Sequence, residues 1–143
     1  MTAKEYLRQL RRIDRQLELL FKEREELERA QTYLRSPQID GDRVQTSPSG
    51  DPPWMGYLIK WEEMTNRIGE EWDRLIEKRQ TIVAQLSTLT DSRYSDLLYK
   101  RYVENKRWAR IAREMHYSVD RILHLHGEAL GVFQQYLAYK GVV

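Results

Sequence analysis

Apolar residues recur every three or four positions along the first 35 residues of the chain. The steps alternate as they do in a heptad repeat, and they fall on Tyr6, Leu10, Ile13, Leu17, Leu20, Arg24, Leu27, Gln31 and Leu34. Arg24 and Gln31 are the two polar breaks in this seam. The spacing predicts one long helix over about residues 2–35, with charged side chains on its other faces.

A second seam with the same rhythm runs through residues 54–89, at Leu58, Trp61, Thr65, Ile68, Trp72, Leu75, Arg79, Ile82, Leu86 and Leu89. Between the seams, residues 36–53 contain all four prolines of the chain and cannot continue either helix. Two seams of matching length joined by a loop favour a long antiparallel helical hairpin, coiled-coil-like in its packing. Pairing of each seam with another copy of the chain is the alternative.

Three shorter helical segments are predicted after the candidate capping residues Thr90–Ser92, at Arg93–Glu104, Lys106–Met115 and Ser118–Tyr139. Their apolar positions form one inward set: Leu97, Leu98, Tyr102, Trp108, Ile111, Ala112, Met115, Ile122, Leu125, Ala129 and Phe133. A three-residue turn before the last helix completes a pattern typical of a helix-turn-helix. We therefore expect an all-α protein with a helical arm over residues 1–89, a three-helix helix-turn-helix domain over residues 90–143, and a hinge at Leu89–Ser92.

Composition narrows the classes of function. The chain has no cysteine, which excludes disulfides and cysteine-based zinc sites. His124 and His126 face different ways on a helix, so we expect no metal site. No nucleophile–base motif or glycine-rich phosphate loop occurs, and we expect neither an enzyme nor a cofactor. Without a signal-peptide core or a membrane-length apolar stretch, a soluble cytoplasmic protein is expected.

The charge of the chain is uneven along its length. Residues 1–90 carry 15 Lys and Arg against 16 Asp and Glu, whereas residues 91–143 carry 9 against 6. This asymmetry favours the C-terminal part as a nucleic-acid-binding face. Its expected phosphate contacts are the four arginines around the predicted turn, Arg107, Arg110, Arg113 and Arg121, with Lys100, Arg101 and Lys106 nearby.

The run RYVENKRWARIAREMHYSVDRILHLHGEAL, residues 101–130, resembles the helix-turn-helix of sigma-factor region four. Two further stretches, AKEYLRQLRRID at residues 3–14 and DRVQTSPSGD at residues 42–51, carry a closer resemblance to a family of short phage and prophage proteins. That family includes late-gene transcriptional regulators of the ArpU and RinA kind. The resemblance implies a helical hairpin followed by a helix-turn-helix, and a role in transcription from phage promoters. It also favours a docking role for the loop, whereas its turn-forming residues alone favour a hinge.

By position in the family, the third C-terminal helix is the recognition helix. The resemblance then implies base-facing roles for Val119, Asp120, Leu123 and His124, with Gly127 one turn further on. Ser118 is expected to cap this helix, and a helix N-terminus is suited to meeting a DNA phosphate. Double-stranded DNA is thus the expected partner, with RNA polymerase and a second copy of the chain as further candidates.

Three positions depart from the family pattern. His116 stands where relatives have glycine in the turn, and a left-handed non-glycine residue there costs about 1 kcal/mol. Arg107 stands where Ser or Thr caps the second helix, and Asn105 is the alternative cap. Val119 and Leu123 are apolar where sigma factors are often basic or polar, which removes guanine readout by arginine and leaves thymine methyl contacts or a protein interface.

Two other functions fit the same pattern. A small-terminase-like DNA-packaging protein also joins a helix-turn-helix to long helices, and assembles as a ring of many copies. A protein-docking module without DNA binding would use the apolar Val119 and Leu123 to bind a helix or a polymerase surface.

Overall fold

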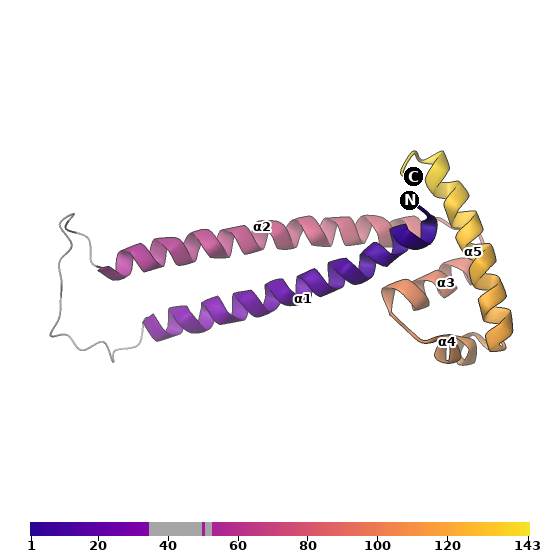
Figure 1. Cartoon of the computed structure of the whole chain (residues 1–143), viewed down its shortest axis with the longest axis horizontal. Coiled ribbons are helices and arrows are strands. Elements are labelled where there is room, and N and C mark those ends of the chain that lie inside the picture. Colours follow the sequence, from indigo (N-terminus) through magenta and orange to yellow (C-terminus); the bar gives the residue numbers. More distant parts are fainter. Residues whose placement is uncertain (35–49, 51–52) are drawn as a thin grey trace. The chain divides into compact units, whose positions relative to one another are not determined.

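The computed structural model describes residues 1–34, 50 and 53–143 (Figure 1). Its helices are α1 (Ala3–Leu34), α2 (Pro53–Ser87), α3 (Ser92–Leu98), the π-helical turn η1 (Tyr99–Val103), α4 (Trp108–Met115) and α5 (Val119–Tyr139). No strand occurs in these ranges, and the expected all-α class is confirmed. Arg35 and most of the predicted 36–53 loop lie outside the described residues, so its role stays a prediction.

Compact packing divides the chain differently from the predicted domains. Unit 1 comprises Met1–Arg15 and Ile76–Val143, and unit 2 comprises Gln16–Leu75. Both long helices therefore run from one unit into the other. The hinge expected at Leu89–Ser92 lies inside unit 1. The domain boundary expected between residues 89 and 90 concerns which parts of the chain fold independently, and it stays a prediction.

Unit 2 is a pair of antiparallel helical segments with little fully buried surface. Its seam residues from Leu17 to Gln31 and from Leu58 to Leu75 are buried or half-buried, except for the exposed Arg24. The indole N–H of Trp61 donates to the carbonyl of Leu27 across the pair, at 2.7 Å. Large apolar side chains remain exposed on the outer faces, among them Leu19, Phe21, Tyr57 and Ile59.

Unit 1 packs the two ends of the long helices against α3, α4 and α5. The backbone N–H of Ala3 donates to the amide oxygen of Gln134 at 2.6 Å, and the rings of Tyr6 and Phe133 lie 6.3 Å apart. These contacts bring the first turn of α1 beside the second half of α5, and the two chain ends lie close together in Figure 1. The base of the hairpin is therefore part of the C-terminal core.

Two polar contacts within unit 1 set the register of α1 and α2. The Tyr6 hydroxyl donates to the side chain of Gln85 at 2.7 Å, and the Arg79 guanidinium donates to Asp14 at 2.8 Å. The partner lies earlier in α2 when the α1 residue lies later in α1, as antiparallel helices require. The seam arginine at position 79 is thus accounted for by a half-buried ion pair.

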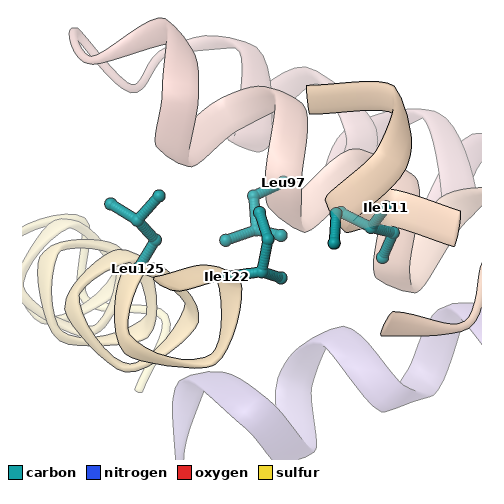
Figure 2. Close-up of a cluster of buried hydrophobic side chains, with 5 residues drawn as sticks. Leu97, Ile111, Ile122 and Leu125 are labelled. Carbon is teal, nitrogen blue, oxygen red and sulfur yellow. The ribbon is translucent and has the colours of Figure 1, made fainter. Parts of the chain in front are cut away.

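A small apolar cluster joins the helices of the expected helix-turn-helix. Leu97 from α3, Ile111 and Ala112 from α4, and Ile122 and Leu125 from α5 are buried together, and Figure 2 shows the leucine and isoleucine side chains meeting between the helices. Trp108, Met115 and Tyr117 pack partly buried around them. All eleven predicted inward residues are buried or half-buried. The small Ala112 suits a close approach of two helices.

The first C-terminal helix departs from the predicted Arg93–Glu104 segment. It is α-helical only to Leu98 and continues as a π-turn, in which the Glu104 N–H donates to the Tyr99 carbonyl at 3.1 Å. Tyr102 and Val103, two consecutive residues of this turn, are both buried. Asn105 then takes a left-handed conformation, with φ 55°, and ends the helical path.

His116 ends α4 in the left-handed conformation, with φ 62° and ψ 40°. The N–H of Tyr117 donates to the Ala112 carbonyl at 3.0 Å, and that of His116 to Arg113 at 3.4 Å, which together form a Schellman motif. Histidine adopts the left-handed conformation more readily than most residues, but its Cβ still makes this conformation less favourable than it is for glycine.

We expect His116→Gly to raise the free energy of unfolding by about 0.5–1 kcal/mol, because it removes the left-handed cost. His124→Gly is the matched control: the same exchange within regular helix should lower that free energy by about 0.5 kcal/mol. Urea unfolding of both variants measures the two effects. Equal destabilisation by both exchanges would contradict the assigned turn.

Candidate nucleic-acid interface

The N-terminus of α5 is built by the turn that precedes it. Ser118 has extended backbone, and its hydroxyl accepts a hydrogen bond from the Arg121 N–H at 3.1 Å, as predicted for the helix cap. One backbone donor of the first turn is thereby satisfied, while other first-turn N–H groups have no partner within a helix. This end of α5 is exposed and is suited to an anionic group.

The start of α4 has no corresponding side-chain cap. Arg107 occupies the capping position with extended backbone, and its side chain makes no capping hydrogen bond. The alternative that Asn105 caps the helix is wrong, because its backbone is left-handed and the helix begins three residues later. The expected helical start at Lys106 is corrected to Trp108 for the same reason.

One face of α5 presents the four residues predicted to meet bases. Val119 and Leu123 are one turn apart, Asp120 and His124 form the neighbouring pair, and all four are exposed. Ile122 and Leu125 on the opposite face are fully buried in the cluster of Figure 2. We refer to the exposed residues Val119, Asp120, Leu123 and His124 as the reading face.

Two features modify the reading face. The His124 ring nitrogen Nε2 lies 3.3 Å from Glu128, so the ring must leave this carboxylate before it reaches a base edge. Gly127 continues the row of Val119 and Leu123, and a Cβ built there would meet no atom within 4 Å. The row therefore has an open position one turn beyond Leu123.

The predicted phosphate-binding arginines differ in their surroundings. Arg107, Arg113 and Arg121 are exposed, and no acidic group of the described residues lies within ion-pair distance of them. Arg110 is also exposed but lies 3.5 Å from Glu114, one helical turn away. Exposed pairs of this kind contribute little to stability, so Arg110 remains able to exchange partners.

Three other basic residues near the turn are occupied by intramolecular contacts. Glu114 accepts from Lys106 at 2.9 Å and from Lys100 at 3.1 Å, and these hydrogen bonds lower the pKa of its carboxyl to about 2. The Arg101 guanidinium donates to the Lys106 carbonyl at 2.9 Å and lies 4.2 Å from the centre of the Trp108 ring. Lys100 and Lys106 are thus paired with a carboxylate, and Arg101 keeps its charge but is held in the turn.

This cluster around Glu114 was missed from the sequence. The only signal for it was the four-residue spacing from Arg110, which predicts a helical ion pair. The two lysines reach Glu114 because η1 and the left-handed Asn105 redirect the chain, and helical periodicity contains no such information.

His126 lies behind the reading face in a partly buried aromatic group. Its Nε2 is 2.9 Å from the Tyr102 hydroxyl, and its ring meets Trp108 edge-on at 4.6 Å. Burial lowers the pKa of His126 to about 4, with further lowering by Lys4 and Arg101. The imidazole is therefore neutral at pH 7 and forms one hydrogen bond with the Tyr102 hydroxyl.

No group of three or more His, Asp or Glu side chains in the described ranges is arranged to hold a metal ion. Across the same ranges, no helix combines the length and apolar character that a membrane span requires.

We expect acidification from pH 7 to pH 4.5 to destabilise the protein more than it destabilises His126→Gln. The unfolded histidine binds a proton below its ordinary pKa of 6.5, whereas the folded one does so only near 4, so the folded state loses stability across this window. With allowance for the half-exposed ring, the extra loss is about 1–2 kcal/mol. Urea unfolding at the two pH values measures it, and an equal pH dependence in both proteins would contradict the assignment.

No protein-family model, curated protein or solved structure matches the chain.

Proposed function

We propose that the protein is a phage-type transcriptional regulator that binds double-stranded promoter DNA through α5. The observation that carries the proposal is the exposed, Ser118-capped start of α5, flanked by arginines without acidic partners at positions 107, 113 and 121. The resemblance of residues 101–130 to sigma-factor region four agrees with this role.

The chemistry of the reading face suits a mixed readout of the major groove. The Asp120 carboxylate can accept from a cytosine amino group, and Val119 and Leu123 can contact thymine methyl groups. His124 can bond a purine edge once its ring leaves Glu128. The flanking arginines and the α5 N-terminus would contact phosphates and set the register of the helix on the duplex.

RNA polymerase is the second partner in this proposal. Sigma region four, which residues 101–130 resemble, acts together with the polymerase at promoters, and the same helix-turn-helix would serve both contacts. The exposed apolar side chains of unit 2, such as Phe21 and Ile59, favour a further contact with a second copy of the chain.

A protein-docking module is the second candidate function, and one observation favours it. Val119 and Leu123 are 41% and 46% exposed at the centre of the reading face. Paired exposed apolar side chains are typical of a surface that binds a partner helix or a protein groove.

We expect the purified protein to bind promoter fragments from the genome that carries its gene, with an affinity that falls steeply as salt rises. Arg113→Gln plus Arg121→Gln should weaken binding by about tenfold or more and reduce the salt slope by about 2, because two phosphate contacts are lost. Fluorescence anisotropy with labelled duplexes across a salt series measures both quantities. Arg29→Gln plus Arg67→Gln removes the same charge from unit 2 and should change affinity less than about twofold.

Absence of binding at about 50 mM salt would reject the DNA-binding proposal. In that case Val119→Ala plus Leu123→Ala tests the docking function. The double variant should then lose binding to RNA polymerase while its helical content and melting temperature stay unchanged.

A further inference from the structure

Unit 1 contains a cavity of about 420 Å³ on the side of α1 that faces η1 and α4. Its wall is formed by the first turns of α1, the Asn105–Arg107 connection and the His126 turn of α5. The size lies within the range of small-molecule binding sites in proteins. The proposed DNA interface includes only one of the residues that line this cavity, Arg107.

The charged residues that line this cavity are all basic. Lys4, Arg8 and Arg11 contribute from α1, Arg101 from η1, and Arg107 from the start of α4, and no Asp or Glu is among the lining residues. Within the described chain no acidic group pairs with Lys4, Arg8, Arg11 or Arg107. Gathering like charges in this way raises the energy of the folded state unless an anion accompanies them.

The sequence places the three α1 cations on one face. Lys4, Arg8 and Arg11 are spaced by four and three residues, so they lie in a row beside the fully buried Leu7. The hydrogen bond from the Ala3 N–H to Gln134 holds this turn of α1 in place. The row is therefore fixed by the core of unit 1.

The inner wall is aromatic, and its side chains are held by contacts with one another. The Arg101 guanidinium is held between the Lys106 carbonyl and the Trp108 ring, and the Tyr102 hydroxyl bonds to His126. The positive charges act on this wall in addition to burial: burial lowers the pKa of His126 and Lys4 and Arg101 lower it further, whereas Arg101 and Arg8 oppose the rise that burial causes in the pKa of Tyr102. Cations on three sides of a partly desolvated wall favour a multiply charged anion over a single carboxylate.

We propose that this cavity binds phosphate groups, with Arg8, Arg11 and Arg107 as the direct ligands and Lys4 as a further charge. Guanidinium groups suit this chemistry because each can donate two parallel hydrogen bonds to phosphate oxygens. The phosphates belong either to a free polyphosphate compound or to a DNA backbone that passes over the start of α1. The inference does not require α5 to read bases.

Pyrophosphate titration of the full-length protein tests the site directly. We expect saturable shifts of the Trp108 indole and His126 ring signals in NMR spectra, and no such shifts with sodium chloride at equal ionic strength. Arg8→Gln plus Arg11→Gln should weaken binding by about tenfold or more. Arg12→Gln plus Arg15→Gln is the matched control, because it removes two exposed charges from the same helix outside the cavity and should change binding less than about twofold.

A DNA arm separates the two sources of phosphate. If Arg8→Gln plus Arg11→Gln weakens duplex binding more than the control does, and pyrophosphate competes with the duplex, the site takes backbone phosphates. If pyrophosphate binds while the Arg8→Gln plus Arg11→Gln exchange leaves duplex affinity unchanged, or no duplex binding occurs, the site takes a free anion. The proposal that the reading face binds DNA is then judged by the salt-series experiment alone. If pyrophosphate causes no specific shift and the two double variants bind duplex equally, the proposal is overturned.

Discussion

The burial of the first two turns of α1 against the C-terminal helices is the constraint on which unit 1 depends. Leu7 and Leu10 are fully buried there, together with Ile82 and Leu86 from the end of α2 and Phe133 and Leu137 from α5. Each such side chain contributes about 1.5–3 kcal/mol on leaving water, so the start of the chain supplies a substantial part of the core beneath α5. The cluster that joins α3, α4 and α5 has five buried members and is the smaller part of the buried apolar set of unit 1.

The periodicity of the sequence predicted the features of the fold that depend on neighbouring residues, and it failed for those that depend on distant parts of the chain. Local rules sufficed for the seams, for the inward face of α5 and for Ser118, because each depends on residues within one or two helical turns. The same rules missed the burial of Ala3 and Leu7, which lie beside the heptad positions; the contact that holds Ala3 comes from Gln134, 131 residues away. They also missed the π-turn, since no local signal distinguishes Tyr99–Val103 from ordinary helix.

The candidate site shows the same division between local and long-range information. The exposure of Val119, Asp120, Leu123 and His124 follows from the spacing of the buried residues on α5. Which cations remain available does not follow from spacing. Glu104 and Glu114 pair with Lys100 and Lys106 because of the path of η1, whereas the row of Lys4, Arg8 and Arg11 reaches Arg107 only because α1 packs into unit 1. Net charge along the sequence therefore located the basic half of the protein but could not show its basic cavity.

Gly127 gives the reading face room to change. It stands in line with Val119 and Leu123, carries no side chain, and has open space where a Cβ would lie. Glycine within a helix costs about 1 kcal/mol relative to alanine, so most replacements would strengthen α5 while adding a group to its exposed row. A single nucleotide change converts a glycine codon to one for arginine, serine or valine. Lineages of this protein can therefore acquire a new surface contact at this position without losing stability, and such a step would change which partner surface the exposed row fits.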